Sequence, residues 1–240
     1  GREELERILT EELKTGGEAL VEALRRQGTD TLFAIPGIQL DWAVDALSAA
    51  DDISVYVPRH EQSVSYMADG YARVTGRPGV GMVVPGPGML NATAGLSTAY
   101  ACNSPVVMIV GQIHSEAIGK GYGNLHEIPD QSLVLQGLTK HQELVSDRGR
   151  IPGAVHDAFQ AAMTGRRRPA GVEIPYDFLR ARDAADSGKT GTEPDTALRP
   201  DPTLIARAAS LIDKAPNLAG LARTCEIFAA SQLVLPSLAV

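Results

Sequence analysis

Short apolar runs alternate with longer amphipathic stretches along most of the chain. Most of the runs are apolar at nearly every position, as is typical of strands buried on both faces of a sheet. The stretches between them show the 3.6-residue period of a helix. This repeated alternation predicts an α/β fold with a doubly wound, six-stranded, mainly parallel sheet. The predicted strands are 32–35, 53–57, 80–84, 106–110, 143–145 and 171–174, and the predicted helices are 41–50, 61–75, 88–101 and 151–163.

Local signals predict one further helix and one irregular segment. Thr15 and Glu18 have the spacing of a capping box, so we expect a helix to begin at Thr15 and to end at Gly28. The segment 115–136 is Gly-rich, polar and without a period. It is too long for a simple connection, and we therefore expect it to be a functional loop.

A change of composition divides the chain after residue 182. The stretch 183–200 is polar, contains Gly and Pro, and has the character of an interdomain linker. Asp201 and Pro202 then predict the cap and first turn of a new helix. Because 201–240 is too short for a stable domain, we expect 1–182 to be one complete domain and 201–240 the incomplete start of a second α/β domain.

Charge and cysteine content narrow the class of protein. The 22 basic and 29 acidic residues give a formal net charge of −7, which favours neither a nucleic-acid nor an anionic-membrane partner. The short basic run 166–168 is expected to be a solvated turn. No apolar run approaches the roughly 18 residues that cross a bilayer. Cys102 and Cys225 form no C-x-x-C pair. We expect a soluble protein of the reducing cytoplasm without a disulfide framework.

Three strand-to-helix turns are the main candidates for a ligand site. They lie at 34–38, 58–62 and 85–88. Ligands of parallel sheets bind beyond the carboxyl ends of the strands, so we expect the three turns to meet at one crevice. Taken alone, each Gly-Pro turn is more readily explained as structural. None fits the dinucleotide-binding glycine fingerprint or a P-loop, which argues against a nicotinamide-dependent dehydrogenase.

At these turns the residues resemble a known family. The run RHEQSVSYMADGYARVTGRPGV at 59–80 is similar to a pattern of the acetolactate synthase group of thiamine-diphosphate enzymes. So are Gly86-Pro87-Gly88 with Asn91, and Thr139-Lys140-His141. The order and spacing match over roughly 15–180. The resemblance implies the thiamine-diphosphate-binding fold, with 1–182 as the domain that binds the aminopyrimidine of the cofactor.

The resemblance also implies roles for individual residues. Glu61 would hydrogen-bond N1′ of the aminopyrimidine and so favour the tautomer whose N4′ removes the thiazolium C2 proton. Without the resemblance, Glu61 would be a first-turn glutamate that only favours the helix dipole. The remaining implied contacts are Pro36, Gly37, Gly86 and Asn91 with the cofactor, and Ile38 and Lys140 with the substrate.

The histidines receive different interpretations. His126 stands where acetolactate synthases usually carry the glutamine of Phe-Gln-Glu, and two roles stay open. It is either a proton carrier for the substrate or a loop histidine bonded to backbone. His60 precedes Glu61 and is expected to orient the turn. His114, His141 and His156 lack metal-ligand spacing, so no metal site is predicted in this chain.

The sequence lacks the family's Gly-Asp-Gly motif, through which another domain binds the diphosphate and its Mg²⁺. We therefore expect the diphosphate-binding domain to be absent from this chain and the active site to form between subunits of a homodimer or homotetramer. FAD, which the central domain binds in some members, is unsupported because 215–240 shows no strand followed by a glycine-rich turn.

The activity implied by the resemblance is decarboxylation of a 2-keto acid with carboligation. A simple 2-keto acid decarboxylase, an oxidase and an oxalyl-CoA decarboxylase-type lyase stay open. A non-catalytic module that keeps the fold is a further alternative.

Overall fold

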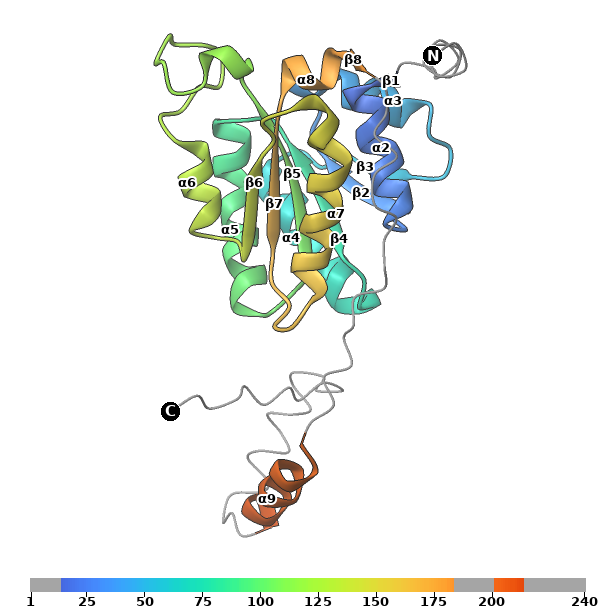
Figure 1. Cartoon of the computed structure of the whole chain (residues 1–240), viewed down its shortest axis with the longest axis vertical. Helices are drawn as coiled ribbons and strands as arrows, with labels where there is room; N and C mark the ends of the chain where they lie inside the picture. Colours follow the sequence, from blue (N-terminus) through green and yellow to red (C-terminus); the bar gives the residue numbers. More distant parts are fainter. Residues whose placement is uncertain (1–13, 184–200, 214–240) are drawn as a thin grey trace, which may run out of the picture. The chain divides into compact units, whose positions relative to one another are not determined.

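The computed structural model describes residues 14–183 and 201–213, which belong to two separate units (Figure 1). In the second unit, helix α9 (Pro202–Asp213) begins directly after Asp201, whose Oδ1 accepts the N–H of Thr203 at 2.8 Å. The predicted cap and helix start are therefore confirmed. The predicted linker lies outside the described residues from 184 onward, as does the tail after 213.

A six-stranded sheet forms the centre of the first unit, as predicted. Its strand order is β3-β2-β4-β5-β7-β6, and every neighbouring pair is parallel. The order reverses between β2 and β4, so the connections that leave these two strands diverge. The strands are β2 (Thr31–Ala34), β3 (Ser54–Tyr56), β4 (Gly79–Val83), β5 (Val106–Gln112), β6 (His141–Leu144) and β7 (Ala170–Pro175).

Helices cover both faces of this sheet (Figure 1). One face packs against α2 (Gly16–Arg26), α3 (Asp41–Ser48) and α7 (Ile151–Met163). The other packs against α4 (Glu61–Thr75), α5 (Pro87–Ala101) and α6 (Gln131–Gln136). The short helix α8 (Tyr176–Arg180) follows β7, and an antiparallel pair, β1 (Lys14–Thr15) with β8 (Arg182–Asp183), joins the two ends of the unit. The fold is thus an α/β fold with helices on both faces of the sheet.

Because helices pack on both faces of the sheet, the sequences of the strands are continuous apolar runs. In β5, Val107 and Ile109 belong to the core on the α2 side, whereas Val106, Met108 and Val110 belong to the core on the α4 side. Successive side chains of a strand point to opposite faces, and here both faces are dry.

The capping box at the start of α2 is present in full. The Thr15 hydroxyl accepts the N–H of Glu18 at 3.1 Å, and the Glu18 carboxylate accepts the N–H of Thr15 at 2.6 Å. The helix ends at Arg26, and Gly28 adopts a left-handed φ of 74° directly after its cap. Both predicted helix boundaries are confirmed to within two residues.

The segment 115–136 is less irregular than predicted. It contains a 3-10 turn, η2 (Ser115–Ala117), and ends in α6. Between these elements the chain extends beyond the carboxyl ends of the strands, at the top of Figure 1. The sequence did not reveal α6 because a helix of six residues is too short to show a clear 3.6-residue period.

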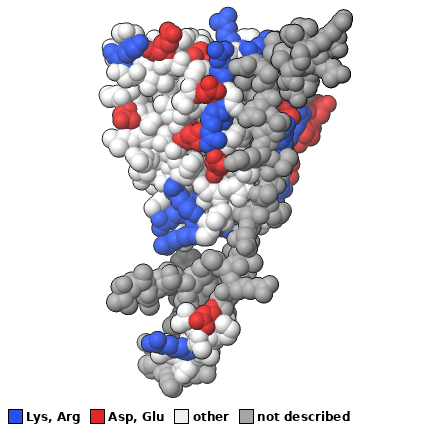
Figure 2. Space-filling view, in the orientation of Figure 1, with Lys and Arg blue, Asp and Glu red and all other residues white. Residues whose placement is uncertain are grey.

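Charges of both signs lie side by side on the face formed by α2 and α7 (Figure 2). The run 166–168 forms the predicted turn between α7 and β7, but it is not simply solvated. The Arg166 Nε donates to Asn103 at 2.7 Å, and the Arg168 guanidinium lies 3.9 Å from the ring centroid of Tyr100. These two contacts hold the turn at 166–168 against the C-terminal end of α5.

Close packing of α4 on the sheet gives a testable expectation. A Cβ on Gly79 would lie 1.9 Å from the backbone oxygen of Ala68 in α4. We expect Gly79→Ala to lower the free energy of unfolding by about 1–3 kcal/mol, because backbone must move. Gly70 lies in the same helix with open space around it. Gly70→Ala should therefore gain up to about 1 kcal/mol from helix propensity. Urea unfolding of the two variants measures this contrast, and equal effects would contradict the packing.

Candidate active site

The candidate site lies where the strand order reverses, beyond the carboxyl ends of β2 and β4. Val84 follows β4 and packs against the turns on both sides. A Cβ on Gly37 would lie 2.4 Å from one Val84 methyl group, and a Cβ on Gly88 would lie 2.5 Å from the other. Glycine at both positions allows these turns to meet. A switch point of a parallel sheet is where ligands bind in such folds.

The third predicted turn reaches the same place through Glu61, the first residue of α4. His60 caps this helix, because its Nδ1 accepts the N–H of Gln62 at 3.1 Å. The expectation that His60 orients the turn is thus confirmed. The Glu61 side chain is half-buried, and its Oε1 lies 3.8 Å from the position that a Cβ of Gly88 would take. The structure therefore brings all three turns together, as predicted.

Asn91 holds the Glu61 carboxylate from α5. The Asn91 Nδ2 donates to Glu61 Oε2 at 2.9 Å. This hydrogen bond joins the first turn of α4 to α5 and fixes the direction of the carboxylate. Glu61 is therefore not a freely rotating first-turn glutamate. The pair combines a proton-accepting carboxylate with an amide that fixes its direction.

The backbone of Gly86 is held by the side chain of Gln131, the first residue of α6. The Gly86 N–H donates to Gln131 Oε1 at 2.8 Å, and Gln131 Nε2 donates to the Gly111 carbonyl at 3.1 Å and to Glu173 Oε2 at 2.8 Å. Gly86 adopts φ 57° and ψ −116°, which few residues other than glycine tolerate. The turn at 85–88 thus has a fixed backbone shape.

Glu173 is the centre of this buried polar network. Its side chain is 0% exposed in the middle of β7. Burial raises the pKa of its carboxyl, opposed by hydrogen bonds from Ser132, Gln131, Gln142 and Gln112. The carboxylate accepts from Ser132 Oγ at 2.7 Å, and from Nε2 of Gln142 at 2.6 Å, Gln131 at 2.8 Å and Gln112 at 3.1 Å. The four donors offset part of the effect of burial, but the pKa of Glu173 stays above its ordinary value.

The loop of segment 115–136 brings His126 to the crevice. The His126 carbonyl lies 2.3 Å from the position that a Cβ of Gly86 would take, so the two backbones are in contact. His126 has a left-handed φ of 69°. Its Nδ1 lies 3.0 Å from Gln39 Oε1, while Gln39 Nε2 donates to the carbonyl of Leu125 at 3.1 Å. Gln39 belongs to η1 (Ile38–Leu40) after β2.

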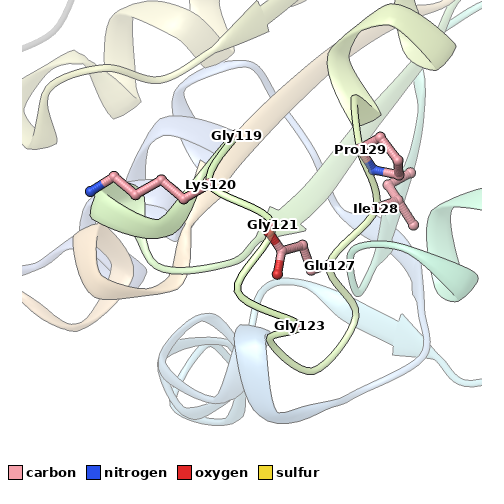
Figure 3. Close-up of a pocket in the computed structure, with 7 residues that line it drawn as sticks. All are labelled: Gly119, Lys120, Gly121, Gly123, Glu127, Ile128 and Pro129. Atoms are coloured by element: carbon pink, nitrogen blue, oxygen red, sulfur yellow. The ribbon is translucent and has the colours of Figure 1, made fainter.

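Glu127 anchors the loop that carries His126. Its carboxylate accepts the N–H of Asn124 at 2.8 Å, and the backbone amides of Asn124, Gly123, Gly121 and Tyr122 lower its pKa. Figure 3 shows the Glu127 side chain directed toward this turn and that of Lys120 directed away from it. A hollow of about 440 Å³ lies in the loop, lined by Gly119, Lys120, Gly121, Gly123, Glu127, Ile128 and Pro129.

The structure does not bring Lys140 to the crevice. Lys140 stands directly before β6, at the amino ends of the strands, and its Nζ donates to the backbone carbonyls of Thr164 and Arg166. Burial lowers the pKa of its amino group. Lys140 therefore does not lie with the three turns of this chain, because a residue that precedes a parallel strand lies at the opposite edge of the sheet, and its contact with substrate stays a prediction. Pro36 and Ile38 do lie at the crevice turn, and both are exposed.

Two of the remaining histidines, His114 and His156, have hydrogen-bonding partners, whereas the buried Nε2 of His141 has none among the described residues. His114 Nδ1 accepts the N–H of Glu116 at 3.3 Å, and His156 Nδ1 lies 3.3 Å from Gln27 Nε2. Within the described ranges 14–183 and 201–213, no cluster of three or more His, Cys, Asp or Glu side chains is suited to a metal ion. In the same part of the chain, no helix has the length and apolar character needed to cross a membrane.

Three residues of the candidate site and of the network behind it escaped the sequence reasoning. Glu173 stood inside a predicted buried strand, where an acidic residue is itself a signal of a polar network. Gln39 directly follows the candidate turn at 34–38, and glutamine there carries no distinct signal. Gln131 lay within the segment predicted to be a loop. The sequence offered no sign that it reaches Gly86, 45 residues away.

The fold and the three convergent turns define an α/β protein with a carboxylate–amide pair at the switch point of a parallel sheet. A family model described as "Thiamine pyrophosphate enzyme, N-terminal TPP binding domain" matches residues 14–134, about half of the chain. Thiamine pyrophosphate is another name for thiamine diphosphate. The chain belongs to this family, and the resemblance found in its sequence is confirmed.

Relatives of known name agree with this assignment. A probable 2-ketoarginine decarboxylase of Pseudomonas aeruginosa is 38% identical over 172 residues, which are 72% of this chain and 31% of that protein. Acetolactate synthase 3, chloroplastic, of Brassica napus is 39% identical over 174 residues, which are 72% of this chain and 26% of that protein. The mitochondrial acetolactate synthase catalytic subunit of Saccharomyces cerevisiae is 33% identical over 214 residues, 87% and 30%. The chain thus spans 26% to 31% of the length of these relatives.

Proposed function

We propose that the protein is a thiamine-diphosphate-dependent enzyme that decarboxylates a 2-keto acid and joins the remaining acyl unit to a second substrate, as acetolactate synthases do. The observation that carries this proposal is the Glu61–Asn91 pair at the sheet's switch point. Plain decarboxylation is the second candidate, because one relative is a probable 2-ketoarginine decarboxylase.

The crevice residues fit the aminopyrimidine of the cofactor. Gly37, Gly86 and Gly88 let the turns pack closely together, because Val84 or the His126 carbonyl occupies the space that a Cβ would need, and this packing fixes the main chain beside which the flat ring would bind. Glu61 would hold a proton at N1′ of this ring, with its direction fixed by Asn91. Pro36 would complete the turn beside it. When bound, the cofactor supplies a thiazolium that accepts the electrons released on decarboxylation.

His126 is proposed as the proton carrier for the substrate, with Ile38 as a substrate contact. Both lie at the crevice turns, and His126 is held there by the Glu127-anchored loop. An imidazole side chain has one ring nitrogen that can take up a proton and give it back, as such a role requires.

The proposed domain organisation follows the family. Residues 1–182 form the pyrimidine-binding domain, 183–200 the linker and 201–240 the start of the central domain. Helix α9 supports this proposal because its apolar side chains Leu204, Ile205 and Leu211 are exposed, and a larger domain would bury them. The diphosphate and Mg²⁺ would be bound by a further domain of a longer polypeptide, and FAD stays unsupported.

The proposed active species is a homodimer or homotetramer with active sites between subunits. Exposed apolar side chains lie on the two helices that carry Glu61 and Asn91, namely Tyr66 (41% exposed), Met67 (37%) and Leu90 (43%). Apolar groups gathered on an exposed face mark protein interfaces. A partner here would cover the half-buried Glu61 and bring a second domain to the crevice.

Calorimetric titration of the 240-residue chain tests the division of the cofactor site. We expect no tight, Mg²⁺-dependent binding of thiamine diphosphate, because this sequence has no Gly-Asp-Gly motif to hold the diphosphate. The full-length protein, titrated in parallel, should bind tightly and only with the metal. Tight metal-dependent binding by the 240-residue chain would contradict the proposed division.

A product assay distinguishes the candidate activities. The full-length protein should convert pyruvate to acetolactate if it is a carboligase. Acetaldehyde would indicate plain decarboxylation, and acetyl phosphate an oxidase. Turnover of 2-ketoarginine but not pyruvate would favour the second candidate.

A further inference from the structure

We propose that Gln39 is a positioning residue that fixes the tautomer of His126, so that His126 Nε2 is the nitrogen that accepts a proton. This inference rests on the proposed function for the use of that proton. The tautomer itself depends only on the hydrogen bonds described here.

Gln39 is held in one place. Its side chain is 7% exposed, and its Cβ lies 3.4 Å from the position that a Cβ of Gly111 in β5 would take. It bridges the turn after β2 and the loop that carries His126, with the distances of 3.1 Å to Leu125 and 3.0 Å to His126 given above. An amide that is buried between two partners keeps one orientation.

The partners determine which end of the amide faces His126. A backbone carbonyl only accepts hydrogen bonds, so the Gln39 NH₂ group must face Leu125. The Gln39 oxygen, which also only accepts, then faces His126 Nδ1. His126 Nδ1 must therefore carry the hydrogen. In the neutral ring, Nε2 is left with its lone pair.

This tautomer stays matched to Gln39 throughout a proton transfer. When Nε2 takes a proton from a substrate O–H group, a new N–H bond forms and the O–H electron pair remains on the oxygen. The Nδ1–H bond is unchanged, so Gln39 Oε1 accepts the same hydrogen bond before and after. Return of the proton from Nε2 restores the starting state without any rotation of the ring or the amide.

The backbone at His126 supports the assignment of a function to this ring. A left-handed φ at a residue other than glycine is energetically unfavourable and persists where the surroundings impose it. Here the surroundings are the Gly86 turn and the Gln39 amide, which lie on two sides of the same residue. The loop thus holds His126 in a costly conformation at the crevice.

The tautomer is directly measurable by NMR. In the 240-residue chain labelled with ¹⁵N-histidine, the His126 ring nitrogens should show protonated Nδ1 and unprotonated Nε2 at a pH where the ring is neutral. Free imidazole side chains in water favour the opposite tautomer. A His126 ring with its hydrogen on Nε2 in the unmodified chain would overturn the inference, whatever the variants do.

Two variants complete the test. Gln39→Met keeps the length of the side chain but removes the acceptor, and it should shift the His126 population toward the Nε2–H tautomer. Gln27→Met is the matched control, because Gln27 lies against His156 Nδ1 and should leave the His126 signals unmoved. An unchanged His126 tautomer in a folded Gln39→Met chain would also overturn the inference.

Kinetics of the full-length enzyme separate this inference from the proposed function. Gln39→Met should lower kcat about tenfold or more with a smaller change in KM, since the ring would present a hydrogen where an acceptor is needed. If His126→Gln leaves kcat unchanged, the proton-carrying role fails while the tautomer stands. The wrong tautomer in the NMR measurement removes the role of Gln39 and leaves the Glu61 proposal untouched.

Discussion

Glu61→Gln should slow the exchange of the cofactor C2 proton by orders of magnitude in the full-length protein. A glutamine cannot hold an exchangeable acid proton at N1′ of the aminopyrimidine, so the ring loses the partner that makes its amino group basic. General acid–base partners of this kind contribute about 10²- to 10⁴-fold. The exchange of C2–H for deuterium, followed by quenched-flow NMR, measures the effect without requiring the natural substrate.

The Glu61 experiment needs controls for charge and for orientation. Glu116→Gln removes an exposed carboxyl from the η2 turn and should leave exchange unaltered. Asn91→Leu keeps the Glu61 carboxylate but removes the amide that orients it, so exchange should fall by a smaller factor than in Glu61→Gln. An exchange rate that is the same in Glu61→Gln and the unmodified protein would favour a module that keeps the fold without the chemistry.

The fold was predictable because its signals are local and repeated. The runs at 80–84 and 106–110 are apolar on both faces of their strands, and helices 61–75 and 151–163 carry a clear period, so their bounds match the structure. Thr15 with Glu18 defined a helix start from two side chains alone. Such features depend on neighbours within a few residues, which the sequence shows directly.

The candidate site was predictable only in part, because its contacts join distant segments. Glu61 and Asn91 were both expected at the cofactor, and they are joined by a hydrogen bond across 30 residues. Their identities came from the family pattern and not from propensity. Lys140 came from the same pattern but lies at the other edge of the sheet. A motif gives residue types, whereas the edge on which a residue lies depends on whether it precedes or follows its strand.

The second large effect is expected at Glu173, which no local signal linked to the site. Glu173→Leu should lower the free energy of unfolding by at least about 3 kcal/mol. The change leaves four donors without this acceptor, two of them on the buried side chains of Gln112 and Gln131, and each buried group left unsatisfied costs about 1–3 kcal/mol. Glu173→Leu also removes the free-energy cost of burying a carboxylate, and this offsets part of the loss of stability. Glu143→Gln on the neighbouring strand is the control. Its carboxylate pairs with Arg150 near the surface, and loss of such a pair should cost no more than about 1 kcal/mol.

The pH dependence of this difference follows from the raised pKa of Glu173. Burial lifts the pKa of the folded protein above the ordinary value of 4.5. At a pH between 4.5 and the raised pKa, Glu173 therefore holds a proton in the folded protein that it has released in the unfolded chain. The contribution of Glu173 to stability is therefore greatest below pH 4.5 and declines as the pH rises through the raised pKa. Urea unfolding of the unmodified chain and of Glu173→Leu at several pH values should show their difference shrinking in that direction. A constant or growing difference would mean that the acid is not desolvated in the fold.

Because Gln131 joins Glu173 to the Gly86 N–H, Glu173→Leu should also loosen the turn at 85–88. In the full-length enzyme, weaker binding of thiamine diphosphate should then accompany the loss of stability.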